Sequence, residues 1–206
     1  MRLITPDNDI TPYTDGVNVF LAGTIDLGNS VDWQTLLAQE LEQRFADTAL
    51  NVYSPRRAEW FGTPTTDNPE FIRQVVWEMD NLEAADIIVM RLLADSKSPV
   101  SLLELGLHAH SGKLIVFCED GFWRKGNVDL TCWRHAIAQV DSTAALLDEL
   151  RSRIENLADR FWAEFSEEDG EWAGHMNGQP YLSWMAPTKD AALDGIRKLA
   201  ESEGLV

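Results

Sequence analysis

The sequence predicts a doubly wound α/β domain with a five-stranded parallel sheet, followed by a small ββ(β)α domain. Up to about residue 159, short apolar runs alternate with longer amphipathic segments. The runs at 85–92 and 114–118 are almost uninterrupted, as in strands buried on both faces of a parallel sheet. From residue 160 onward, strand-like segments follow one another directly. We therefore expect one domain over residues 1–159 and a second over 160–206.

The first domain is expected to contain five strands joined by helices. Residues 1–16 hold several turn formers and are expected to be irregular. The strands are expected at 17–22, 50–54, 85–92, 114–118 and 136–140. Polar residues that suit helix N-caps precede the helical segments, namely Ser30, Asn68, Ser98 and Ser142. The stretch 119–129 is expected to be a long polar loop that holds two large aromatic residues.

Two of these helices are relevant to function. The helix that begins at Asn68-Pro69 is expected to bury an apolar face consisting of Ile72, Val75, Val76, Met79 and Leu82. The next helix begins at Pro99, which suits a first helical position, and Gly112 suits its exit. Glu104 falls in its second turn, near the sheet edge where α/β proteins bind ligands.

The second domain is expected to start with strands at 161–165, 171–176 and 181–185. The Glu167-Glu-Asp-Gly170 stretch is typical of a hairpin turn. Thr188 is expected to cap a last helix that turns Ala192, Ile196 and Leu199 inward.

The charge and cysteine content of the chain argue against several classes of partner. The net charge is −17, from 34 acidic and 17 basic residues, so a nucleic acid polymer would be repelled. A small nucleotide remains compatible, because a helix N-terminus and a few arginines can hold one phosphate. The two cysteines, Cys118 and Cys132, have neither metal-binding nor disulfide-framework spacing. No membrane span or signal peptide is recognisable, so we expect a cytoplasmic protein without membrane contact.

Several polar and aromatic residues have competing interpretations. From the pattern alone, a structural role for Glu104 is favoured over catalysis, and Asp86 is expected to close the entry to its strand. Arg56 and Arg57 could bind a phosphate or pair with carboxylates. The loop aromatics could stack on a base or pack internally; they are Trp60, Phe122 and Trp123. His108 and His110 lack further ligands nearby in sequence, so no metal is expected.

Three motifs resemble the nucleoside 2-deoxyribosyltransferase superfamily over residues 17–140. They are Phe20-Leu-Ala-Gly-Thr-Ile-Asp26, Ala84-Ala-Asp86, and Leu-Glu104-Leu-Gly106 with Gly112-Lys113. The resemblance implies a flavodoxin-like fold and an enzyme that acts on a nucleoside or nucleotide. In that family a glutamate attacks the anomeric carbon of 2-deoxyribose, the base leaves, and a second base or water accepts the sugar.

The resemblance also assigns roles to individual residues. It implies that Glu104 is the nucleophile and that Glu78, where an aspartate is more usual, contacts the sugar. Ser98 stands where transferases have an aspartate and where nucleotide N-hydrolases hold a 5′-phosphate with serine. Phe20 replaces a family tyrosine, and Asn127 is expected in a loop that approaches the site of a neighbouring subunit.

The first loop completes the implied substrate-binding set. Gly23 is expected to let the backbone approach the ligand, and Asp26 is either a ligand contact or a turn residue. The resemblance implies no cofactor and no metal, and it implies a homo-oligomer.

The tail from Phe161 to Glu203 resembles a HicB-like antitoxin domain, which implies a protein-interaction module. Two other functions stay open at this point. One is a non-catalytic nucleotide-binding or regulatory protein, motivated by Phe20 and Glu78; the other is a glycohydrolase of another ribosyl ligand such as NAD. The sequence leaves the base, the choice between nucleoside and nucleotide, and the choice between transfer and hydrolysis undetermined.

Overall fold

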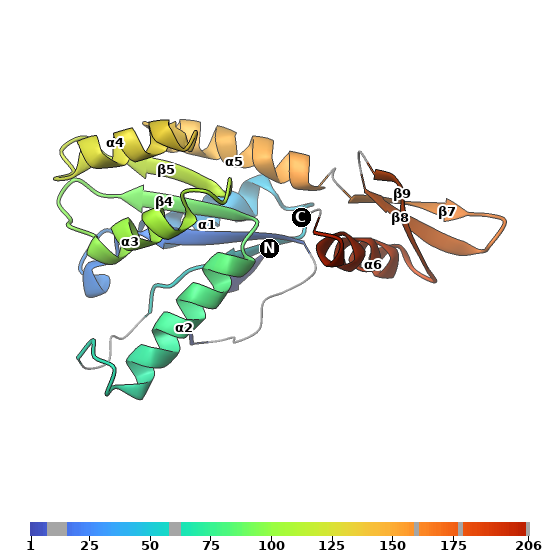
Figure 1. Cartoon of the computed structure of the whole chain (residues 1–206), viewed down its shortest axis with the longest axis horizontal. Helices are drawn as coiled ribbons and strands as arrows, with labels where there is room; N and C mark the ends of the chain where they lie inside the picture. The colour runs from blue at the N-terminus through green and yellow to red at the C-terminus, as the bar shows by residue number, and fades with distance from the viewer. Residues whose placement is uncertain (8–15, 58–62, 159–160, 177–178, 205–206) are drawn as a thin grey trace. The chain divides into compact units, whose positions relative to one another are not determined.

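The predicted α/β fold is confirmed by a computed structural model, which describes residues 1–7, 16–57, 63–158, 161–176 and 179–204. A six-stranded parallel sheet has the order β1-β3-β2-β4-β5-β6, and a three-stranded antiparallel sheet has the order β7-β8-β9. Figure 1 labels β4 and β5 of the first sheet and all strands of the second. The chain forms two compact units, Met1–Leu150 and Arg151–Val206, which divide within helix α5.

The large sheet has six strands, so the expectation of five was wrong by one. The strands are β1 (Arg2–Ile4), β2 (Val17–Gly23), β3 (Leu50–Tyr53), β4 (Ile87–Leu92), β5 (Leu114–Cys118) and β6 (Ala138–Val140). The additional strand, β1, lies in the segment expected to be irregular and pairs with β3, with Leu3 opposite Val52. Three residues are too few to show a period of two, and only Ile4 of this strand is buried. Backbone pairing at the sheet edge therefore forms this strand.

Helices join β2 to β6 in chain order: α1 (Trp33–Arg44), α2 (Pro69–Ala84), α3 (Pro99–His108) and α4 (Lys125–Arg134). A further helix, α5 (Thr143–Ala158), follows β6. A short 3-10 turn, η1 (Asp26–Gly28), follows β2. Helix α4 corrects the loop expected over 119–129. Gly126 and Asn127 have low helix propensity, but Val128 and Cys132 are buried against the sheet, and this packing stabilises the helix.

In the first unit, the predicted caps were right at two helices and wrong at two. Asn68 accepts from the backbone N–H of Glu70 at 3.1 Å, and Ser142 accepts from that of Ala145 at 3.2 Å. At α1 the cap is Asp32 rather than Ser30, whose hydroxyl instead donates to a backbone carbonyl in the preceding loop. Ser98 precedes α3 but makes no capping bond.

Side chains from alternate positions of the large sheet are buried on opposite faces. One face packs against α2, α3 and α4 through Phe20, Ala22, Ile88, Met90, Leu92, Leu114, Val116 and Cys118. Residues in between are buried as well: Val19, Leu21, Ile87, Val89 and Ile115. Burial on both faces explains the almost uninterrupted apolar runs of β2, β4 and β5.

Helix α2 does not bury the face that its apolar residues predict. Ile72, Val76 and Met79 are exposed. The buried positions are Gln74, Trp77, Asn81 and Leu82, so only the last agrees with expectation. Trp77 decides the orientation, because its ring packs on Phe20 and Tyr53 at centroid distances of 6.0 and 6.3 Å. The Trp77 ring buries a large apolar area, and its contacts with these two rings fix the face of α2 that turns inward. As a result, α2 turns the polar side chains of Gln74 and Asn81 toward the interior.

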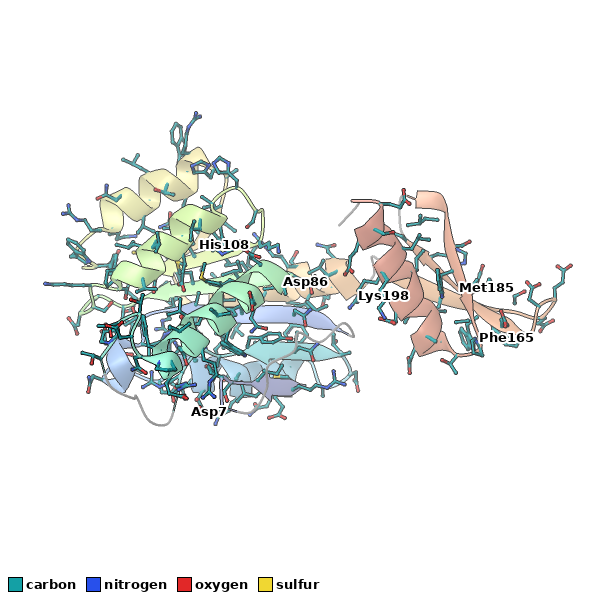
Figure 2. The ribbon with its side chains drawn as sticks, turned by 60° about the horizontal axis from the view of Figure 1, so that its bottom comes forward. Asp7, Asp86, His108, Phe165, Met185 and Lys198 are labelled. Atoms are coloured by element: carbon teal, nitrogen blue, oxygen red, sulfur yellow. The ribbon has the colours of Figure 1, made fainter. Side chains whose placement is uncertain are left out.

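The smaller unit is the expected ββ(β)α arrangement: β7 (Phe161–Ser166), β8 (Glu171–Met176), β9 (Gln179–Ala186) and α6 (Lys189–Ser202). Figure 2 labels Phe165 and Met185 on its strands and Lys198 on its helix. Thr188 caps α6 by accepting from the Ala191 N–H at 3.3 Å, as predicted. Gly174 allows α6 to approach closely, because a Cβ there would lie 2.2 Å from the Ala192 carbonyl oxygen.

Candidate active site

Two glutamates from neighbouring helices interact at the carboxyl-terminal side of the large sheet. Glu78 lies on α2 and Glu104 lies on α3, and both side chains are partly buried. They are near enough that the charge of Glu78 disfavours ionisation of Glu104. The tertiary structure thus pairs two carboxyl groups that are 26 residues apart in the sequence, and a pair of this kind is suited to chemistry at a glycosidic carbon.

Glu78 is held in place by polar groups from the end of β3 and from its own helix. The Gln74 amide nitrogen donates to the Glu78 carboxylate at 2.5 Å and to the Pro55 carbonyl at 3.0 Å. The buried Arg57 guanidinium acts on Glu78 electrostatically and also pairs with Asp7 at 3.5 Å and Glu70 at 4.0 Å. These contacts anchor the first half of α2 over the end of β3.

The surroundings raise the pKa values of both carboxyl groups. Burial raises the pKa of Glu78 from 4.5 to about 7, although the Gln74 hydrogen bond and the Arg57 charge oppose the shift. Burial raises the pKa of Glu104 from 4.5 to about 8, and the Glu78 charge adds to that shift. Both carboxyl groups therefore keep their protons to a higher pH than a glutamate in water does.

Three hydroxyl groups form a buried cluster just before α3. The Thr24 hydroxyl lies 2.9 Å from that of Ser96 and 2.7 Å from that of Ser98, and the two serine hydroxyls are 2.5 Å apart. Thr24 Oγ1 also accepts from the Leu93 backbone N–H at 3.0 Å. This cluster explains why Ser98 does not cap α3: its backbone is left-handed, with φ of +42°, and its hydroxyl is directed to the other two.

The predicted site residues on β2 and in the turn after it have clear structural roles. Phe20 is 1% exposed and packs on Trp77 within the core. Gly23 has φ of +126°, and a Cβ there would lie 2.1 Å from the Arg91 carbonyl oxygen, so the close approach seen here is to β4. Asp26 is exposed, and its carbonyl accepts from the backbone and side chain of Asn29, as expected of a turn residue. Substrate contact by these three residues stays a prediction.

Asn127 does not lie in a loop. It is exposed in the first turn of α4, where its carbonyl accepts from the Thr131 hydroxyl at 2.9 Å. Its approach to a neighbouring subunit therefore stays a prediction, made now for a helix residue. Nearby, Phe122 is buried in the core, whereas the half-exposed Trp123 donates to the Lys97 carbonyl at 3.0 Å. This bond ties the segment after β5 to the start of α3.

Other candidate residues make structural contacts. Arg56 donates to the Gly28 and Ser30 carbonyls at 3.0 Å and pairs with Asp32 at 3.4 Å, which fixes the loop after β2. Asp86, labelled in Figure 2, accepts from the Asn18 N–H at 2.8 Å and closes the entry to β4. The predicted stacking role of Trp60 falls outside the described residues.

The sequence interpretation missed Gln74, Thr24 and Ser96. Gln74 could have been found from its position four residues before Glu78, since side chains at i and i+4 meet on a helix. Thr24 and Ser96 carry no comparable signal, because their contact with Ser98 depends on how the ends of β2 and β4 meet in the sheet.

The described part of the chain contains no group of three His, Cys, Asp or Glu side chains placed to hold a metal ion, and no helix long and apolar enough to cross a membrane. One groove there follows α2 but contains neither Glu78 nor Glu104; it is lined by Pro6, Pro69, Ile72, Arg73, Val76, Trp77 and Asp80.

Comparisons with known proteins agree with this fold. A crystal structure of a conserved protein from Enterococcus faecalis V583 is similar in fold, with a TM-score of 0.50 and 16% sequence identity, over 67% of this chain and 99% of that one. No curated protein matches the sequence. The family described as "Nucleoside 2-deoxyribosyltransferase like" matches residues 16–122, which span β2 to the segment after β5 and include Glu78, Ser98 and Glu104. The chain therefore belongs to the nucleoside 2-deoxyribosyltransferase-like family.

Proposed function

We propose that this chain is an enzyme that cleaves or transfers at the N-glycosidic bond of a deoxynucleoside or its 5′-monophosphate, with Glu104 as the nucleophile. The observation that carries the proposal is the pair of partly buried glutamates, Glu104 and Glu78, whose charges interact. A carboxylate suits this reaction because the transition state resembles an oxocarbenium ion, which an anion both stabilises and traps.

The first step forms a bond between a Glu104 carboxylate oxygen and the anomeric carbon, while the bond from that carbon to the base nitrogen breaks. The base leaves with the bonding electron pair and takes up one proton from water. The nucleophile must be ionised to attack, and its raised pKa makes the carboxylate more basic than a glutamate in water. Glu78 beside it is assigned to orienting the sugar.

The second step returns Glu104 to its starting form. A water oxygen, or a nitrogen of a second base, bonds to the anomeric carbon while the ester bond to Glu104 breaks. The attacking group loses one proton to solvent, and Glu104 leaves as a carboxylate. No cofactor takes part in this sequence.

The hydroxyl cluster of Thr24, Ser96 and Ser98 is assigned to the 5′ end of the substrate. It stands at the N-terminal end of α3, where backbone N–H groups favour negative charge. The cluster consists of neutral hydroxyls, so it would not repel a 5′-phosphate as the aspartate of the transferases would. This assignment supports a nucleotide substrate over a free nucleoside.

The test is base release from a panel of deoxynucleosides and their 5′-monophosphates, followed by liquid chromatography with and without an acceptor base. Wild type is expected to release base, and Glu104→Gln is expected to be inactive. Glu83→Gln, which changes an exposed glutamate on α2, serves as the matched control and should retain activity. Dependence on the acceptor base separates transfer from hydrolysis.

Two results would contradict the proposal. Full activity of Glu104→Gln would remove the nucleophile assignment. Tight nucleotide binding by folded wild type, with no base released from any substrate, would instead indicate a non-catalytic binding protein.

A further inference from the structure

A buried amide beside Glu78 has an acceptor that nothing in the described part of the chain satisfies. Gln74 is 6% exposed and lies one helical turn before Glu78 on α2. Its nitrogen donates both to the Pro55 carbonyl and to the Glu78 carboxylate. Its oxygen, Oε1, is fully buried and has no hydrogen-bond partner among the described residues. A buried acceptor without a donor is costly, so its retention beside a functional carboxylate calls for a reason.

The orientation of this amide is determined by its partners. The Pro55 carbonyl can only accept, so the atom of Gln74 that faces it must be the nitrogen. A flipped amide would bring oxygen against oxygen at Pro55. The same nitrogen reaches Glu78, so Oε1 belongs to the planar group that touches the Glu78 carboxylate. An amide oxygen and a carboxylate therefore lie close together at this point.

The Gln74 amide oxygen and the Glu78 carboxylate together determine which chemical groups of a ligand could bind beside them. Both groups accept hydrogen bonds, so together they favour a hydrogen-bond donor such as a hydroxyl and disfavour a phosphate or another anion. A 2-deoxyribose carries a 3′-hydroxyl and a 5′ group, and the hydroxyl cluster at Ser98 is assigned to the 5′ end. The donor left for this site is the 3′-hydroxyl.

We propose that Gln74 is a positioning and specificity residue whose amide oxygen accepts a hydrogen bond from the 3′-hydroxyl of the substrate sugar, while its amide nitrogen holds Glu78. The assignment rests on the proposed function. It adds a specificity for sugars that carry a 3′-hydroxyl, and it gives α2 a second residue that acts on the substrate beside Glu78.

Asn81 offers a matched control on the same helix. It is also buried, and its side-chain oxygen is likewise without a partner in the described part of the chain. However, its amide nitrogen donates to the Trp77 carbonyl at 2.7 Å rather than to a candidate catalytic group. Asn81→Leu therefore disturbs a buried amide of α2 without removing the contact to Glu78.

The experiment compares kcat/KM for a 2′-deoxynucleotide and its 2′,3′-dideoxy analogue in wild type, Gln74→Met and Asn81→Leu. Methionine has a similar length but neither donates nor accepts strongly. Wild type is expected to favour the substrate with the 3′-hydroxyl, and Gln74→Met is expected to reduce that preference by about tenfold, the effect typical of losing one buried hydrogen bond. Asn81→Leu is expected to keep the wild-type preference.

The outcomes separate the two proposals. Base release from folded wild type with equal rates on both substrates overturns the Gln74 assignment alone, whether or not Gln74→Met folds. Equal losses on both substrates in Gln74→Met do the same, because a merely structural role changes both alike. Absence of base release from every substrate by folded wild type overturns the proposed function, and the Gln74 assignment falls with it.

Discussion

Replacement of Glu104 by glutamine should stabilise the folded chain, and the gain should grow with pH. Folding raises the pKa of this carboxyl from 4.5 to about 8, chiefly by burial and secondarily through the charge of Glu78. A difference of this size corresponds to about 5 kcal/mol at about 1.4 kcal/mol per pKa unit. Relaxation and water entry in a real protein reduce such costs, so this figure is an upper bound.

The sign follows from proton binding. Between pH 4.5 and about 8 the folded chain holds the Glu104 proton more tightly than the unfolded chain does. The contribution of this group to stability is therefore fully present below pH 4.5 and is lost as the pH rises through about 8. Glutamine does not titrate. Its advantage over glutamate is expected to reach about 1 kcal/mol at pH 5.5, about 3 kcal/mol at pH 7 and up to about 5 kcal/mol at pH 9.

Urea denaturation at these three pH values measures the difference between the free energies of unfolding of Glu104→Gln and wild type. Glu83→Gln controls for loss of an exposed glutamate and should show a small difference that varies little with pH. A stability difference for Glu104→Gln that is the same at pH 5.5 and pH 9 would refute the raised pKa of Glu104. It would mean that burial and the charge of Glu78 do not disfavour the ionised carboxylate.

Two further predictions concern the scaffold. Gly23→Ala places a Cβ on a backbone with φ of +126° and 2.1 Å from the Arg91 carbonyl oxygen, so we expect a loss of about 3 kcal/mol or more in thermal or urea unfolding. Gly106→Ala, whose Cβ would meet nothing within 4 Å, should instead add about 0.5–1 kcal/mol, and similar losses in both variants would contradict the argument. Burial raises the pKa values of the Cys118 and Cys132 thiols to about 11, so neither should react with a thiol reagent at pH 8 until the chain is denatured. Rapid labelling of the native protein would show that these thiols are accessible.

Elements whose signal is local were predictable. Strands β4 and β5 are continuous apolar runs because they are buried on both faces, and that burial follows from the alternation of strands and helices. The starts of α2 and α6 were also recognisable, because a cap needs only the capping side chain and the next few N–H groups. The position of Glu104 on a helix after β4 belongs to the same class of local inference.

Features that depend on partners elsewhere in the chain were not predictable in this way. The prediction of the buried face of α2 was wrong because Trp77 packs on Phe20 of β2 and Tyr53 of β3. Helix α4 was missed because its stability comes from Val128 and Cys132 against the sheet rather than from its own propensities.

The sequence by itself determined the α/β class, the alternation of strands and helices in the first unit, and the location of Glu104 on the helix after β4, because each depends on residues close together in the chain. Only the tertiary structure decided that Glu78 and Glu104 interact, that the Ser98 hydroxyl joins Thr24 and Ser96, and that Gln74 holds Glu78. Charge repulsion, desolvation and hydrogen bonding act over a few ångströms in space. Their outcome is therefore set by which strands and helices meet, and no distance along the sequence encodes that.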